Sequence, residues 1–136
     1  FFFTGAHLRY LQKHFWRTNY SVSFPRLRPF AGSYQPNFPV SDRQLVQLIT
    51  ALRIFDENVE MALSTRESPH FRDHAFPLGI TSMSAGSSTQ PGGYSNEAKH
   101  LEQFEVADHR SPEEMVSMIE DRGYEAVWKN WDKALQ

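Results

Sequence analysis

Three short apolar segments in the first part of this chain each follow a segment with helical periodicity. They cover residues 20–26, 59–67 and 78–86. Strands that alternate with helices are typical of parallel βα units. Ligand sites of parallel α/β folds lie at the carboxyl ends of the strands. The polar and small residues at those positions are Arg26, Arg28, Ser64, Thr65, Arg66, Glu67, Ser82, Ser84 and Gly86. The pattern therefore predicts an α/β fold with a ligand site among these residues.

Helices are predicted ahead of each apolar segment. The spacing of apolar residues indicates an amphipathic helix over about residues 4–17. Ser41 and Gln44 form a capping box, in which each side chain pairs with a free backbone N–H group at the start of the next helix. Ser68 and Pro69 supply a cap and a first-turn proline for a short third helix. The core-facing stripe of the second helix consists of Leu45, Leu48, Ile49 and Leu52.

The last third of the chain has a different pattern. Residues 87–94 are rich in Ser, Gly and Pro and predict a loop. Residues 111–114 carry another capping signal, and they precede a helix that Gly123 should end. Residues 125–128 predict a further short strand. We therefore expect an extension of a different kind after the βα units.

Composition excludes several classes of protein. The 136 residues carry 14 Lys and Arg against 16 Asp and Glu, a balance that does not favour nucleic-acid binding. There is no apolar stretch of membrane-spanning length, so no contact with a membrane is expected. The chain has no cysteine. This excludes disulfides, a cysteine nucleophile and cysteine-ligated metal centres within these residues, and it fits a cytoplasmic origin.

The start of the chain indicates a part of a longer protein. It begins at Phe1 without methionine and enters a helical pattern at once. Three parallel strands also cannot bury both faces of a sheet, as the strands of a closed barrel do. We therefore expect apolar edges that the rest of the protein would cover.

Arg26 and Arg28 alternate between prolines just past the first predicted strand. A guanidinium group held in a fixed direction can grip a carboxylate or a phosphate with two parallel hydrogen bonds. Each arginine can instead pair with a neighbouring acid, because charge clusters are also built for structure. Both interpretations stay open for both residues.

The segment Leu63–Glu67 follows the second strand. Alternation along a strand places Ser64 and Arg66 on one face, with Leu63, Thr65 and Glu67 on the other. A charge just past the last apolar residue of a strand is in the position of a site residue, so Arg66 is expected to contact a ligand. For Glu67 a structural role is favoured, either pairing with Arg66 or lying near the start of the next helix.

Two further signals are weaker. Residues 82–93 are small and hydroxyl-rich, which lets a ligand approach the backbone but is also typical of an ordinary turn. His70 and His74 have the i, i+4 spacing of metal ligands, with Glu67 one turn earlier. The His-Glu-x-x-His order is lacking, however, and no fourth ligand lies nearby in the sequence. We interpret them as solvated helix residues and predict no metal site in this chain.

Several longer segments carry a family resemblance. In order they are residues 11–16, 20–29, 43–46, 63–68, 89–94, 101–104 and 127–132. Together they resemble the C-terminal part of the 2-iminoacetate synthases, the tyrosine lyases of thiamine biosynthesis. The resemblance implies the (β/α)₈ barrel of the radical S-adenosylmethionine enzymes. Residues 1–86 would be its last three strands with their helices, and residues 87–136 a C-terminal extension that closes and packs on the barrel.

The resemblance also implies a reaction. In this family a [4Fe–4S] cluster cleaves S-adenosylmethionine, and the resulting radical breaks the Cα–Cβ bond of tyrosine to give 2-iminoacetate and p-cresol. The cluster cysteines lie early in the family's barrel and are absent here, so this chain alone is expected to be inactive. The partners implied are the N-terminal part of the same barrel, the thiazole synthase that uses the imine, and tyrosine as substrate.

Site residues follow by position. In related aromatic amino-acid lyases an arginine at a late strand end binds the substrate carboxylate, and a serine on the next strand contacts the same end of the substrate. Arg66 and Ser84 are the matches here, with Ser64 and Thr65 orienting Arg66 or touching the substrate. Two further groups are implied more broadly. Arg26 and Arg28 would contact either substrate or S-adenosylmethionine, and Gln90, Gly92 and Gly93 would form a loop at the barrel mouth.

Two alternatives belong to other classes. A phosphate-binding barrel enzyme could use residues 84–93 as a phosphate cradle, but an irregular polar stretch rather than a helix follows those glycines. A non-catalytic interaction module could dock through residues 115–122 and the Trp-rich tail. It would need a core of its own, which three parallel strands do not provide.

Overall fold

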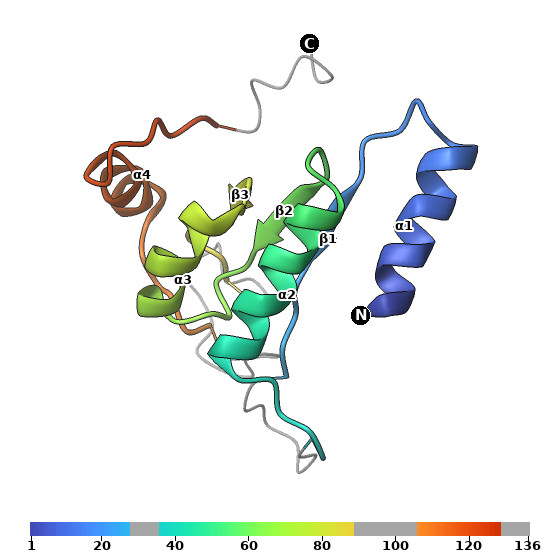
Figure 1. Cartoon of the computed structure of the whole chain (residues 1–136). Helices are drawn as coiled ribbons and strands as arrows, with labels where there is room; N and C mark the ends of the chain where they lie inside the picture. The colour runs from blue at the N-terminus through green and yellow to red at the C-terminus, as the bar shows by residue number, and fades with distance from the viewer. Residues whose placement is uncertain (28–35, 89–105, 129–136) are drawn as a thin grey trace.

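The computed structural model describes residues 1–27, 36–88 and 106–128. Helices and strands alternate along the first two of these ranges, and a last helix lies in the third (Figure 1). The elements in order are α1 (Phe2–His14), β1 (Ser21–Ser23), α2 (Asp42–Phe55), β2 (Glu60–Leu63), α3 (Pro69–Ala75), the short 3₁₀ helix η1 (Phe76–Leu78), β3 (Ser82–Met83) and α4 (Pro112–Glu120).

The strands form a parallel sheet in the order β1-β2-β3 within the described ranges. β1 pairs with β2 in the register Ser21 to Glu60, and β2 pairs with β3 in the register Ala62 to Ser82. This confirms the predicted α/β class with parallel strands. The capping box at Ser41 is also confirmed, as is the one at residues 111–114.

The strands are shorter than the apolar segments that predicted them. Pro25 has no N–H to donate, so the ladder of β1 does not extend to the end of its segment. After β2 the chain turns, and the N–H of Glu67 donates to the carbonyl of Ser64 at 3.3 Å. The third segment begins in η1, and Gly79 then reverses direction with φ at +120°. A proline and a turn thus end the first two strands early, whereas η1 and Gly79 delay the start of the third.

Two other predictions need correction. The first helix covers Phe2–His14, not residues 4–17. Residues 125–128 do not form the predicted strand. They lie over the sheet, where they help to line a cavity, and pair with no strand in the part of the chain that the structure describes. This short segment therefore serves as part of a cavity wall and not as a strand.

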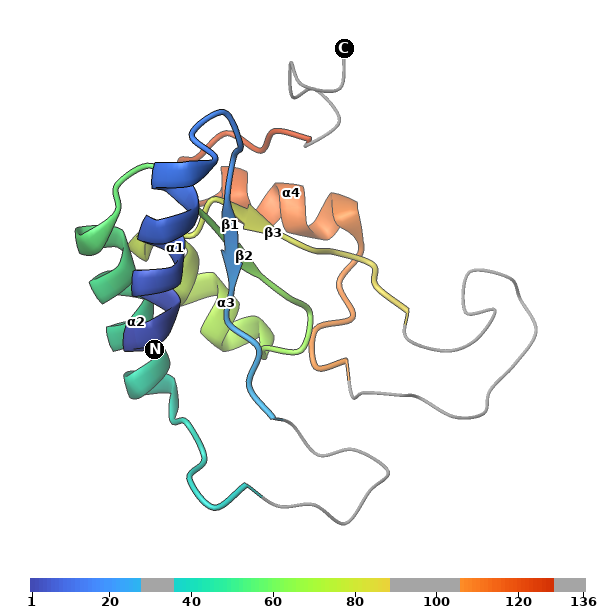
Figure 2. The same cartoon turned by 90° about the vertical axis from the view of Figure 1, so that its right-hand side faces the viewer.

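The main core lies between the sheet and the helices α1, α2 and α3. α1 and α2 lie together on one side of β1 and β2 (Figure 2). Burying these apolar side chains, at roughly 25 cal/mol per Å² of area, supplies the main driving force for this layer. The buried members are Leu8, Phe24, Leu45, Ile49, Leu52, Val59, Met61, Leu63, Phe71 and Ala75.

A second, smaller core fixes α4. Phe76 of η1 packs with Met115 and Met118 of α4. α4 thereby lies near β3 and far from α1 (Figures 1 and 2). Among the described residues, none of the helices combines the length and the apolar character needed to cross a membrane.

Candidate functional site

The sheet presents two chemically different faces. Successive side chains of a strand point to opposite faces. Met61 and Leu63 of β2 are buried in the helix-covered core. Glu60 and Ala62, together with Ser64 just past the strand, therefore lie on the other face, and all three line a cavity there. We refer to this side of the sheet as the open face.

Small and hydroxyl-bearing residues meet across the open face. The register pairs Ala62 with Ser82. One step further along, the N–H of Ser84 donates to the carbonyl of Leu63 at 3.2 Å. Ser84 is thereby held beside Ser64 at the carboxyl ends of β2 and β3. This is the edge at which parallel α/β folds bind ligands.

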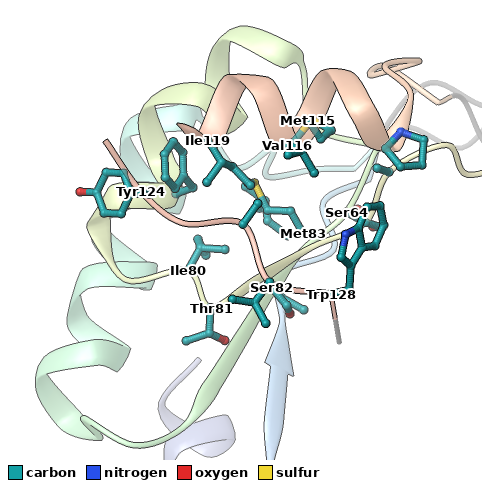
Figure 3. Close-up of a pocket in the computed structure, with 18 of the residues that line it drawn as sticks. Ser64, Ile80, Thr81, Ser82, Met83, Met115, Val116, Ile119, Tyr124 and Trp128 are labelled. Atoms are coloured by element: carbon teal, nitrogen blue, oxygen red, sulfur yellow. The ribbon is translucent and has the colours of Figure 1, made fainter. Parts of the chain in front are cut away.

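The open face forms one wall of a cavity of 940 Å³. α4 and residues 124–128 supply the facing wall (Figure 3). Tyr124 and Ile80 lie toward one end of the cavity, and Trp128 and Ser64 lie toward the other. A cavity of this size accommodates a ligand as large as an amino acid or a nucleoside.

The predicted ligand residues after β2 and β3 divide into two groups. Ser64 and Ser84 are exposed and line the cavity. Thr65 is buried, and Arg66 is half-buried with its N–H donating to the Ser64 hydroxyl at 3.4 Å. Neither Thr65 nor Arg66 is among the described residues that line the cavity. Leu63, Thr65 and Glu67 are buried while Ser64 is exposed, but residues 64–67 form a turn and not a continued strand. The placement of Arg66 on the face of Ser64 therefore stays a prediction.

Arg26 is held by acids. Its guanidinium forms a two-pronged pair with the Glu67 carboxylate, and its Nη1 lies 2.7 Å from Asp42. It also faces the ring of Phe71, with the guanidinium carbon 5.1 Å from the ring centroid. Of the two interpretations of Arg26, the structure shows pairing with neighbouring acids. The hydrogen bonds that Arg26 donates to Glu67, opposed by burial, raise the pKa of Arg26.

Glu67 has a partner that sequence reasoning did not name. Its side chain is only 2% exposed, and it accepts hydrogen bonds from Arg26 on a distant strand end. The structural role predicted for Glu67 thus involves Arg26, a pairing that neither of the two predicted roles included. Four other predicted residues lie outside the described part of the chain, namely Arg28, Gln90, Gly92 and Gly93.

A second charge cluster, on α3 and the extension, was also missed. Arg72 donates through Nη1 to Asp108 and through Nη2 to the carbonyl of Ser84. Arg110 donates to Asp108 at 2.9 Å and to Asp73 at 2.8 Å. Both the Arg72 and the Asp108 side chains are 0% exposed. We refer to these residues as the α3 charge cluster.

The electrostatics of this cluster follow from burial and pairing. Burial opposes ionisation of Asp108, but hydrogen bonds from Arg110 and the charge and hydrogen bond of Arg72 outweigh it, so the pKa of Asp108 is lowered to about 2. Burial also opposes ionisation of Arg72 and thereby lowers the pKa of Arg72, although the charge and hydrogen bond of Asp108 act to raise it. The sequence carried one signal for this pair. Arg72 lies between Phe71 and Ala75 on the apolar side of α3, where an arginine needs an acidic partner.

Comparisons with known proteins identify the family. The profile described as "Biotin and Thiamin Synthesis associated domain" matches residues 23–125, which is most of the chain. The chain belongs to this family. The matched range contains the last residue of β1, all of α2, β2, α3, β3 and α4, and the α3 charge cluster. It also contains every residue that lines the cavity except residues 126–128.

Two curated relatives confirm the predicted resemblance. The 2-iminoacetate synthases of Salmonella typhimurium and Escherichia coli are each 48% identical to the chain over 134 residues, or 98% of it. The chain spans 36% of the length of each.

Solved structures of hydrogenase maturases have the same fold. The FeFe-hydrogenase maturase HydG of Carboxydothermus hydrogenoformans superposes with a TM-score of 0.75 at 37% identity, over 89% of this chain and 28% of the maturase. Another crystal structure of HydG gives a TM-score of 0.76 at 38% identity, over 87% of this chain and 26% of the other.

The chain supplies no ligand for a cysteine-bound iron–sulfur cluster, because its 136 residues contain no cysteine. Within the described ranges there is also no group of three or more His, Cys, Asp or Glu side chains that could hold a metal ion.

Proposed function

We propose that this chain is the C-terminal, substrate-side part of a tyrosine lyase that cleaves the Cα–Cβ bond of L-tyrosine to 2-iminoacetate and p-cresol. The observation that carries the proposal is the 48% identity to two 2-iminoacetate synthases over nearly the whole chain. The open face supports it, because a hydroxyl-lined cavity at the carboxyl ends of parallel strands suits a small polar substrate. The relatives favour this function over a phosphate-binding barrel enzyme or a non-catalytic module.

The remainder of the protein would complete the fold. β1 and β3 each pair on one edge only within the described residues. Further parallel strands on both edges would close a (β/α)₈ barrel and turn the open face into its interior. In this proposal residues 1–86 supply the last part of the barrel, and residues 87–136 form the extension. The chain alone is inactive, because S-adenosylmethionine and a [4Fe–4S] cluster would be held by the rest of the enzyme.

The substrate would be held by its amino-acid end. Arg66 lies two residues after Ser64, just past the carboxyl end of β2, and its fork of donors suits a carboxylate. Ser84 would contact the same end of tyrosine from the neighbouring strand. A substrate fixed in this way presents one hydrogen atom to the radical. Ser64 and Thr65 would orient Arg66 or touch the substrate directly.

Other contacts belong to the same proposal. Arg28 would reach the substrate or S-adenosylmethionine, while Arg26 would shape the rim through its pair with Glu67. The loop that contains Gln90, Gly92 and Gly93 would close the mouth of the barrel. A thiazole synthase would receive the imine.

The test is a substitution at Arg66 in the complete enzyme. Arg66→Lys keeps the positive charge but loses the two-pronged grip, so the KM for tyrosine should rise about tenfold or more, the equivalent of one charge-assisted hydrogen bond. Cleavage of S-adenosylmethionine without tyrosine should change much less. Arg43→Lys, at an exposed position on α2, is the matched control. An unchanged KM for tyrosine in Arg66→Lys would refute the carboxylate role.

A further inference from the structure

The segment 106–110 of the extension contacts the ends of two neighbouring strands. The carbonyl of Thr65, just past β2, accepts N–H bonds from Ala107 at 2.9 Å and from Asp108 at 3.0 Å. The carbonyl of Ser84, just past β3, accepts a hydrogen bond from Arg72, which also pairs with Asp108. One short segment thereby ties together the two strand ends that carry the predicted substrate residues.

Ser84 is held at both ends of its peptide backbone. Its N–H donates to the carbonyl of Leu63 at 3.2 Å, and its carbonyl accepts from Arg72. The chain is anchored again two residues later, where the N–H of Gly86 donates to the carbonyl of Arg110 at 3.2 Å. The position of Ser84 in the cavity wall therefore depends in part on where Arg72 lies.

Arg72 cannot easily take another position. Its side chain and that of Asp108 are both 0% exposed. A buried charge that leaves its partner loses its compensation, and water cannot replace the partner there. Arg110 adds a further constraint, since its Nε donates to Asp108 at 2.9 Å and its Nη1 to Asp73 at 2.8 Å.

We propose that Arg72 and Asp108 are positioning residues for amino-acid binding, because together they set the position of Ser84 beside Ser64 in the cavity wall. This inference rests on the proposed function. Neither residue lines the cavity among the residues that the structure describes, so both act through the backbone of Ser84 and Thr65.

The experiment compares variants of the complete enzyme, with KM for tyrosine and cleavage of S-adenosylmethionine measured separately. Arg72→Lys keeps the buried charge beside Asp108 but cannot also reach the Ser84 carbonyl. Displacements of about 1 Å at a reacting group can cost about a hundredfold, so we expect a ten- to hundredfold rise in KM for tyrosine. Cleavage of S-adenosylmethionine without tyrosine should be retained. Asp73→Asn changes an acid of the same charge cluster that accepts from Arg110 and Arg122 in the described part of the chain, and not from Ser84 or Thr65. This variant should leave both values near those of the wild type.

A double-mutant cycle keeps the inference testable if Arg72→Lys also weakens folding. Once Ser84→Ala has removed the hydroxyl, moving residue 84 should have little further effect on KM, so the two substitutions should be strongly non-additive. A general loss of folded enzyme would instead lower kcat for every variant and act additively with Ser84→Ala.

The outcomes separate this inference from the proposed function. If Ser84→Ala and Arg66→Lys both leave the KM for tyrosine unchanged, the proposed substrate site is wrong. If they raise it but Arg72→Lys leaves it unchanged or acts additively with Ser84→Ala, the positioning role is overturned and the proposed function stands. A raised KM in Arg72→Lys, with a non-additive double variant and a normal Asp73→Asn, supports the inference.

Discussion

The two faces of the sheet differ in how completely other parts of the chain cover them. On the helix side, Met61 and Leu63 are buried among apolar residues of α1, α2 and α3. On the open face, Ala62, Ser64 and Ser84 border a cavity. Ala62 is half-buried there, and both serines are exposed. The same strands thus serve stability on one side and leave hydroxyl groups available on the other. This difference locates the candidate site more firmly than any single residue does.

A similar contrast separates the two kinds of polar group at the strand ends. Arg72 and Asp108 are fully buried and paired, whereas Ser64 and Ser84 are exposed. Charges that are enclosed by protein hold the backbone in place, and hydroxyls that face a cavity remain free to bind. The predictions below probe this contrast.

The largest effect is expected from breaking the buried charge pair. Asp108→Ala leaves the Arg72 guanidinium enclosed without its acidic partner, which should lower the free energy of unfolding by about 4 kcal/mol. Asp73→Ala removes an acid of the same charge cluster whose side chain is 20% exposed, and about 1 kcal/mol is expected there. Urea denaturation of the complete protein measures both. Equal losses for the two variants would contradict the distinction between the buried and outer parts of the cluster.

A smaller effect is expected from adjacent residues on opposite faces of β2. Met61→Ala removes a side chain that is 0% exposed, and the cavity left behind should cost about 3 kcal/mol. Ala62→Ser adds a hydroxyl on the open face and should change the stability by less than about 0.5 kcal/mol. The check is the same denaturation assay, and a comparable loss in Ala62→Ser would show that the open face is packed after all.

The smallest of these effects is a dependence on pH. The pKa of Asp108 is about 2 in the folded protein, below its ordinary value of 3.8. As the pH falls, Asp108 is therefore protonated in the unfolded state before it is protonated in the folded state. The stabilisation that ionised Asp108 gives the folded protein is present above about pH 4 and is lost as the pH falls toward 2. The shift corresponds to about 2 kcal/mol. Unfolding curves between pH 5 and 2 should show a steeper decline for the wild type than for Asp108→Asn, and parallel declines would contradict it.

Local patterns predicted the elements and their order. Caps such as Ser41 and Ser111 are set by side chains three residues apart, and the alternating burial of residues 60–63 needs only strand geometry. The ends of the strands were less predictable, because a turn after Ser64 and the φ of Gly79 compete with an apolar run.

The pairings between distant segments could not be predicted. Arg26 lies 41 residues from Glu67, and Arg72 lies 36 residues from Asp108. The first pair depends on how β1 pairs with β2, and the second on how the extension packs against α3. No local pattern encodes either arrangement. The candidate site was predicted through the strand ends, but the buried charges that hold those ends were not.

The most direct test of the account is a product measurement on the complete enzyme. The purified protein, with its cluster reduced, is incubated with S-adenosylmethionine and L-tyrosine, and p-cresol is quantified by chromatography. The account predicts p-cresol in proportion to the 2-iminoacetate formed, with a higher tyrosine requirement in Ser84→Ala. Cleavage of S-adenosylmethionine without any p-cresol would contradict it.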